Sequence, residues 1–126
     1  MTSARQQVVD AITPVLPKNW RVVPYLTSFD ALTQTIVMIH ATGVERFPQA
    51  PAKTYQITFE ATVLDPSKDP ARVWDSLDDE VLEAIAALDT IDSLNWTGAE
   101  PVAYPAETPQ FFGWTITFTV PYEHED

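Results

Sequence analysis

A chain of 126 residues with 45% hydrophobic residues is long enough for one domain with a hydrophobic core and too short for two ordinary domains. A formal net charge of −11, with only 7 basic residues, argues against a surface that binds nucleic acid or an anionic membrane through cations. The absence of cysteine excludes disulfides and thiolate chemistry. Because no apolar run approaches the length of a membrane span, we expect a soluble protein made in the cytosol.

The beginning of the chain predicts a helix and a short strand. A capping-box pattern at residues 3–6 precedes apolar residues at helical spacing, and Pro14 and Pro17 are expected to end this helix. Residues 20–25 have the valine and aromatic content of a strand. Since proline cannot donate to a strand ladder, Pro24 restricts this strand to a sheet edge or a bulge, and we expect an edge strand.

Residues 35–43 and 44–53 differ in pattern. The first segment is apolar at odd and even positions, which predicts a central strand buried on two faces. The second has two prolines and no periodicity, which predicts a long loop between strands. We expect this loop to become ordered on binding a neighbour or a partner, with Arg46, Phe47 and Lys53 as candidate interface residues. An ordinary surface loop is the alternative.

Residues 54–64 and 112–122 alternate between apolar and polar side chains, which predicts two strands that each bury one face. The opposite faces are rich in threonine and poor in charge. Such faces suit a partner, although threonine also favours strands in general. The apolar members are Tyr55, Ile57, Phe59, Ala61 and Val63 in the first strand, and Phe112, Trp114, Ile116, Phe118, Val120 and Tyr122 in the second.

The clearest helix of the chain follows the first of these strands. Asp69 is a good N-cap, Pro70 fits the first helical position, and apolar residues at helical spacing continue to Leu88. Its apolar face is expected to pack on the sheet. A further strand at 93–104, interrupted near Gly98, precedes the last strand.

The whole chain therefore predicts a single α+β domain over residues 1–126, with the element order α-β-β-β-α-β-β. We expect a mostly antiparallel sheet with two helices packed on one face, and an acidic C-terminal tail at 123–126.

The charges are divided unequally along the chain. No lysine or arginine follows Arg72, whereas residues 73–126 hold 12 of the 18 carboxylates. Concentrated like charge destabilises a compact state, so its presence needs a reason. The division suits a chain that presents a charged face to a neighbouring copy or to a passage.

The search for catalytic and binding motifs finds none. The two histidines, His40 and His124, are too few for a histidine-rich metal site, and we expect His40 to be a core or near-core residue. The three glycines are too far apart for a phosphate-binding loop, and no serine has a nucleophile-elbow context. The carboxylates at 75–80 share one helix and cannot surround an ion, so we interpret them as a solvated face. We expect no catalytic residue, cofactor or metal.

A family resemblance enters at residues 54–91. The strand TYQITFEATVLD, the turn DPSKDP and the acidic helix ARVWDSLDDEVLEAIAALD resemble the middle of the tail terminator proteins of long-tailed bacteriophages. The segment VLPKNWRVVPY and the closing strand FFGWTITFTVPY are similar to that family's layout over nearly the whole chain. The resemblance implies a homohexameric ring in the virion that caps the finished tail tube and ends its polymerisation. It also implies that the ring joins the tail to the head completion or connector protein while DNA passes through without specific binding.

Within that expectation, the carboxylates of the second half are candidates for the lumen of the ring or for contacts between subunits. An acidic passage repels phosphate, and an asymmetric charge distribution suits the unlike patches of a ring interface. Two alternatives remain, namely another phage neck or tail adaptor of similar fold and, more weakly, a small ligand-binding or hydrolytic domain. The candidate residues are Asp75, Asp78, Asp79, Glu83, Glu123, Glu125 and Asp126.

Overall fold

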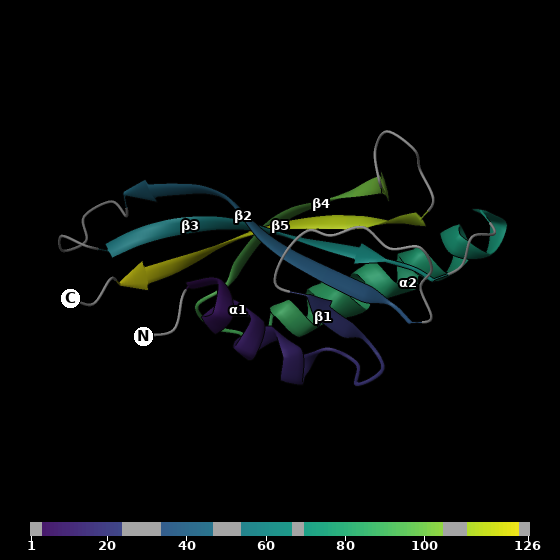
Figure 1. The fold of residues 1–126 in the computed structure, drawn as a ribbon, viewed down its shortest axis with the longest axis horizontal. Helices are drawn as coiled ribbons and strands as arrows, with labels where there is room; N and C mark the ends of the chain where they lie inside the picture. Colours follow the sequence, from purple (N-terminus) through teal and green to yellow (C-terminus); the bar gives the residue numbers. More distant parts are fainter. Residues whose placement is uncertain (1–3, 24–33, 47–53, 67–69, 105–110, 124–126) are drawn as a thin grey trace.

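The computed structural model describes residues 4–23, 34–46, 54–66, 70–104 and 111–123, and for residues 70–77, Tyr104 and Glu123 it describes the backbone. The predicted α+β fold and its element order are confirmed (Figure 1). The elements in chain order are helix α1 (Ala4–Ile12), the 3-10 helix η1 (Thr13–Val15), strands β1 (Arg21–Val23), β2 (Ile36–Arg46) and β3 (Thr54–Leu64), helix α2 (Pro70–Leu88), and strands β4 (Asn95–Tyr104) and β5 (Phe111–Glu123).

The strands form one sheet in the order β1-β2-β3-β5-β4. β1 pairs with β2 in parallel, and all other neighbouring strands are antiparallel. The short strand β1 lies at one edge of the sheet, as the sequence predicts for the strand of residues 20–25. Both helices cover the same face of the sheet, as expected (Figure 1).

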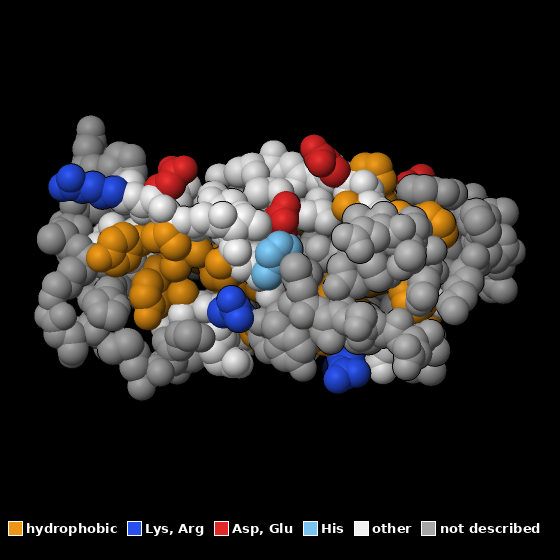
Figure 2. Space-filling view, turned by 45° about the horizontal axis from the view of Figure 1, so that its top comes forward, with side chains coloured by type: hydrophobic (Ala, Val, Ile, Leu, Met, Phe, Trp, Pro, Cys, Tyr) orange, Lys and Arg blue, Asp and Glu red, His pale blue; other side chains and the backbone are white. Residues whose placement is uncertain are grey.

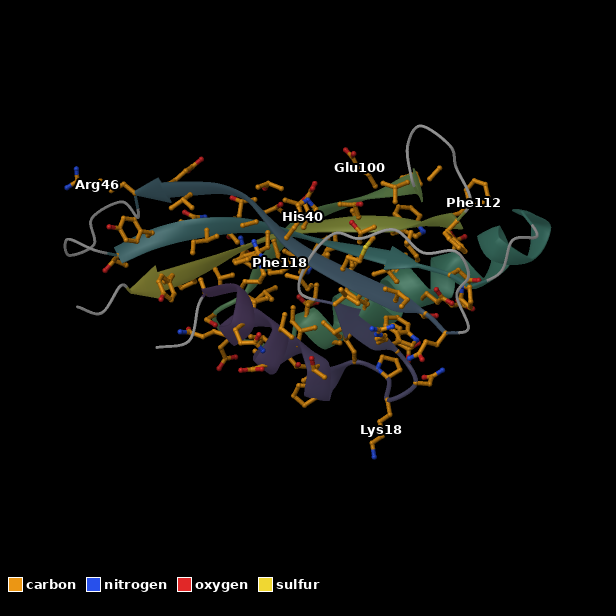
Figure 3. The ribbon with its side chains drawn as sticks, in the orientation of Figure 1. Lys18, His40, Arg46, Glu100, Phe112 and Phe118 are labelled. Carbon is orange, nitrogen blue, oxygen red and sulfur yellow. The ribbon has the colours of Figure 1, made fainter. Side chains whose placement is uncertain are left out.

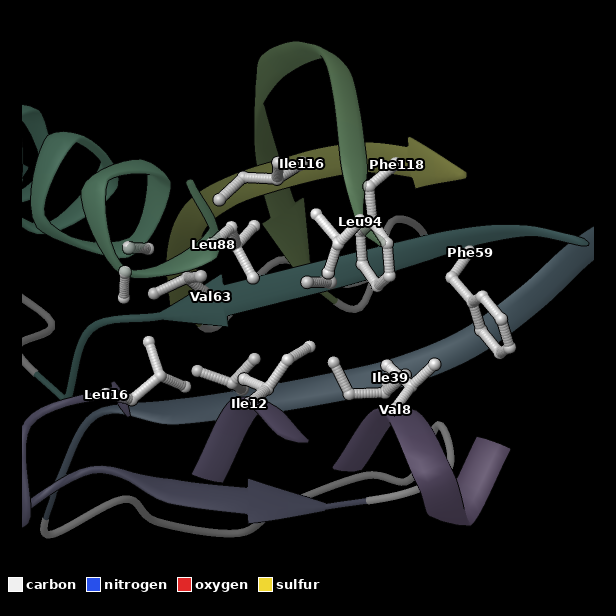
Figure 4. Packing of buried hydrophobic residues seen from close by; sticks show 14 of the residues in the cluster. Val8, Ile12, Leu16, Ile39, Phe59, Val63, Leu88, Leu94, Ile116 and Phe118 are labelled. Carbon is white, nitrogen blue, oxygen red and sulfur yellow. The ribbon is translucent and has the colours of Figure 1, made fainter. Parts of the chain in front are cut away.

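The main core fills the space between this face and the helices. α1 contributes Val8, Val9 and Ile12, while the inward face of α2 contributes Val81, Ala84 and Leu88. At the centre, the fully buried rings of Phe59 and Phe118 stack with their centroids 5.7 Å apart (Figure 4). Burying each such ring contributes about 1.5–3 kcal/mol, so this pair helps to fix β3 and β5 against the helices.

A second, smaller cluster lies on the opposite face, at the end of the sheet where β1 pairs with β2. Its members are nearly or completely buried, and the alternation of β3 and β5 alone does not predict it. One member, Phe111, precedes the predicted start of the last strand and points away from the helices. The cluster consists of Val23, Ile36, Met38, Leu64 and Phe111.

Gly113 lies close to this second cluster and allows a close approach of two strands. It pairs with Leu64 of β3, and a Cβ atom at position 113 would lie 1.7 Å from the carbonyl oxygen of Val63. No real Cβ atom approaches backbone this closely, so any side chain here forces β3 and β5 apart.

Two β-bulges interrupt the strand pairing at the same level of the sheet. β2 has an extra residue, Thr42, opposite β3, and β4 has an extra residue, Thr97, opposite β5. Each hydroxyl donates to a carbonyl of the neighbouring strand, Thr42 to Thr58 at 3.4 Å and Thr97 to Thr117 at 3.2 Å. The bulge at Thr97 confirms the predicted interruption near Gly98.

The sequence predictions for β2 are partly wrong. Residues 36–39 are buried on both faces as predicted, but every residue from Ala41 to Arg46 is exposed. The predicted loop at 44–53 is also too long, because 44–46 continue β2 in register with β3. The reason for both errors is the same, since β1 pairs only with residues 36–38 and α1 covers only part of the sheet.

Smaller differences concern the ends of elements. Pro14 does not end the first helix directly but lies within η1. The predicted strand 93–104 begins at Asn95, because residues 90–94 form a turn in which Leu94 N donates to Ile91 O at 3.1 Å. The predicted tail at 123–126 begins one residue later, since Glu123 is the last residue of β5.

Candidate functional site

The predicted interface loop contributes one described residue. Arg46 is exposed at the last position of β2, at the end of the sheet remote from β1 (Figure 3). Phe47 and Lys53 lie outside the described residues. In the strand ladder Arg46 pairs with Tyr55 of β3, which pairs in turn with Tyr122 of β5. Arg46 therefore marks the outer end of three strands.

This end of the sheet extends beyond the helices and leaves apolar side chains exposed (Figure 1). Val44 is 62% exposed, and Tyr55, which the sequence places in the core, is 36% exposed. A hollow runs over this region between the start of α1 and strands β2 and β3, lined by Ala4, Arg5, Ala41, Val44, Ile57 and Phe59. In Figure 2 it appears as hydrophobic surface near basic side chains. We call Arg5, Ala41, Val44, Arg46 and Tyr55 the overhang.

The predicted acidic residues of α2 lie on its outer side. Asp78, Asp79 and Glu83 are exposed, as predicted for a solvated face. Between them lies Leu82, which is 64% exposed and was not singled out by the sequence pattern. Since residues three and four apart are neighbours on a helix, Asp78 and Asp79 flank Leu82 on its N-terminal side. We call these four residues the acidic ridge. Asp75 belongs to α2, and its side chain is not among those that the structure describes.

Of the remaining acidic candidates, the structure describes only the backbone of Glu123. Glu123 ends β5 and pairs in the ladder with Thr54 of β3, so its backbone lies at the overhang end of the sheet. Glu125 and Asp126 lie outside the described residues. The backbone of Glu123 therefore belongs to a different region of the molecule from the acidic ridge.

The sheet face opposite the helices is largely polar. Its central threonines bond within the sheet, as in the contact between the hydroxyls of Thr62 and Thr115 at 3.3 Å. His40 is half-buried on this face, near the core as predicted, and its Nε2 lies 3.1 Å from Glu60 Oε1. The threonine contact lies within the sheet, so it favours the simpler reading of the threonines as strand formers, whereas His40 Nδ1 is buried without a hydrogen-bond partner among the described residues.

A cleft of about 260 Å³ opens between α1, the turn before β4 and the outer parts of β3 and β5. Its walls are mainly apolar, with Val8, Phe59, Leu94 and Val120 among them, and Gln7, Ser93 and Tyr122 contribute polar groups. Among the residues that the structure describes, no histidine, aspartate or glutamate lines it. The cleft is therefore suited to burying apolar surface.

The most perturbed acidic group of the described chain lies elsewhere. Glu80 of α2 extends towards the sheet, where Thr35 Oγ1 donates to Glu80 Oε1 at 3.5 Å and the Asp65 side chain is nearby. Burial, followed by the hydrogen bond and charge of Asp65, raises the pKa of Glu80 to about 8. Glu80 is thus protonated in the folded protein at neutral pH. The sequence pattern groups Glu80 with the solvated carboxylates, because helical spacing does not reveal a carboxyl partner just after the end of β3.

Three further searches complete the description. Within the described ranges no group of three or more histidine, aspartate or glutamate side chains is placed to hold a metal ion. None of the helical segments described is long and apolar enough to cross a membrane. In comparisons with known proteins, the chain matches no family model and no curated protein.

Proposed function

We propose that this protein is a tail terminator of a long-tailed bacteriophage, which forms a ring on the end of the tail tube, stops its growth and connects it to the head. The observation that carries the proposal is the presence of two unlike exposed surfaces on one small domain, the basic and apolar overhang and the acidic ridge. A ring needs such a heterologous pair, because each copy must meet the next through two different patches.

The layout of the fold supports this proposal. The order α-β-β-β-α-β-β and the placement of both helices on one sheet face agree with what the resemblance implies for the family. The number of subunits, six, and the partners, the tube protein and the head completion protein, come from the resemblance.

A second component of the proposal is passage of DNA through the ring without specific binding. A hexamer would carry six times the chain's formal charge of −11, and a wall rich in carboxylates repels phosphate. The acidic ridge and the end of β5 are the two candidate linings, and their separation means that one can face the lumen while the other meets a neighbour.

A small ligand-binding or hydrolytic domain is less well supported. Such a site combines a pocket with a perturbed titratable group, but here the apolar cleft and Glu80 are separate. Another neck or tail adaptor keeps the assembly role and changes the partners.

Tube assembly tests the proposal directly. A tail tube protein, whose gene is expected to lie next to that of a terminator, is allowed to polymerise with and without the purified protein, and tube lengths are measured by electron microscopy. We expect shorter tubes with a ring of this protein at one end, together with a hexameric mass for the complex released from it. Unchanged tube lengths with no protein at the ends would rule out a terminator and favour a different adaptor.

A further inference from the structure

The two most exposed large hydrophobic side chains of the described chain are Leu82, at 64%, and Val44, at 62%. They lie on surfaces of opposite charge. Leu82 projects from the acidic ridge, which holds Asp78, Asp79 and Glu83, whereas Val44 borders a hollow that Arg5 also lines. An exposed leucine or valine alone needs no explanation. The occurrence of these two side chains on two different surfaces with complementary charges does need an explanation.

The overhang has the form of a receptor for a small apolar side chain. Its hollow is floored by Ala41 and Ile57, with Arg5 on the α1 side. Arg46 stands two residues after Val44 on the same strand, and alternate strand residues share a face. The apolar floor therefore has a cation on two sides.

The acidic ridge has the complementary form. On the helix surface Asp78 and Asp79 lie beside Leu82 on its N-terminal side, so a Leu82 side chain that enters an apolar hollow brings these two carboxylates to the rim of the hollow. Charge pairs at such a rim contribute chiefly to orientation and association rate, while burial of the leucine supplies most of the affinity.

The two surfaces cannot meet within one copy. The overhang is formed by the ends of β2 and β3 that extend past α1, whereas α2 underlies the other part of the sheet (Figure 1). A contact between them requires a second molecule, and repeating it from copy to copy leads to a closed ring or a filament.

We propose that the acidic ridge of one copy docks on the overhang of the next, with Leu82 seated in the hollow beside Val44 and the ridge carboxylates paired with Arg5 and Arg46. This inference rests on the proposed ring and names the contact that forms it.

Cross-linking between two single-cysteine variants tests the contact, since the natural chain has no cysteine. Val44→Cys and Leu82→Cys proteins are mixed at high concentration and treated with a short bis-maleimide. We expect a heterodimer as the main product, and a ladder of oligomers from the double variant. The matched control is Val15→Cys with Leu82→Cys, because Val15 is an exposed valine of η1 outside both surfaces.

Charge exchange adds a second readout. Arg46→Glu is expected to weaken self-association about three- to tenfold, and adding Asp79→Lys to restore part of the loss. Lys18→Glu, at an exposed position away from the overhang, is expected to have no effect (Figure 3). Leu82→Ser is expected to weaken association roughly ten- to a hundredfold without unfolding the protein, because position 82 is exposed.

The outcomes separate the two proposals. If the wild-type protein self-associates or caps tubes but Val44→Cys joins Leu82→Cys no better than the Val15 control does, this contact is wrong and the ring must use another surface. Preferential joining of two Val44→Cys copies would likewise overturn it in favour of a two-fold contact. If the wild-type protein forms no oligomer in concentrated solution or on tubes, the proposed function itself fails.

Discussion

The two ends of the sheet differ in how they are covered. At the β1 end, the second cluster and the main core bury both faces, and residues of β2 from Ile36 to Ile39 are 0–2% exposed. At the overhang, the same strand exposes every residue from Ala41 onward. One continuous strand thus serves as core in its first half and as surface in its second. The difference indicates that burial stabilises mainly the β1 end of the sheet. The exposed residues at the overhang are less constrained by packing and are available for binding.

The largest expected effect comes from removing an aromatic ring at the centre of the core. Phe118→Ala deletes a fully buried side chain and its stacking on Phe59, so the free energy of unfolding should fall by about 3–5 kcal/mol. Val44→Ala at the overhang should change it by less than about 0.5 kcal/mol. Urea denaturation of both variants measures the contrast. Equal losses would mean that the overhang is buried in the isolated protein.

A matched pair of glycines gives the next largest effect. In Gly113→Ala the new Cβ collides with the backbone of Val63, and we expect a loss of about 1–3 kcal/mol or more. Gly43 has no atom within 4 Å of its would-be Cβ, so Gly43→Ala should leave stability unchanged or raise it by up to about 1 kcal/mol. Thermal unfolding of the two variants distinguishes the ends of the sheet, and a destabilised Gly43→Ala would contradict the assignment of that end as open.

A third prediction concerns the pH dependence of the covered end. Because the pKa of Glu80 is raised from 4.5 to about 8 on folding, the folded state holds a proton that the unfolded chain releases. The contribution of protonated Glu80 to the stability of the folded state is complete below pH 4.5 and is lost as the pH rises through 8. Wild-type stability should therefore fall between pH 5 and pH 8 by an amount on the order of 1 kcal/mol, allowing for partial exposure of the group.

Denaturation at pH 5, 6.5 and 8 measures this dependence. Glu80→Gln has no proton to lose and should remove the fall, while Asp79→Asn, at an exposed position of the same helix, should retain it. An identical pH dependence in wild type and Glu80→Gln would show that other groups cause it.

The smallest effect on stability is expected at the outer end of β2. Replacing Arg46 with alanine, together with Phe47→Ser and Lys53→Ala, should leave the melting temperature nearly unchanged. Joining of the protein to tail tubes, followed by sedimentation, should nevertheless decrease. Normal joining by the triple variant would overturn the prediction that Arg46, Phe47 and Lys53 form an interface.

The sequence predicts the element order because periodicity is strong where one face is buried. The alternation from Ile57 to Val63 and from Trp114 to Val120 identifies β3 and β5 correctly. The sequence pattern does not show which parts of the sheet other elements cover. It therefore places Tyr55 in the core and predicts burial of β2 beyond Ile39. Of the candidate acidic residues of α2, Asp78, Asp79 and Glu83 are exposed as predicted, but the different environment of Glu80 depends on contacts between distant segments.

The paired bulges have a consequence for the geometry of assembly. Thr42 and Thr97 each add one residue to a strand that flanks the central β3–β5 pair, on the two sides of the stacked Phe59 and Phe118. Bulges increase the local right-handed twist, so the overhang is rotated relative to the part of the sheet that α2 covers. In the proposed contact, this rotation contributes to the angle between one copy and the next. The curvature of a closed ring, and with it the width of the hole, then depends on two threonines that are not among the residues of the proposed contact.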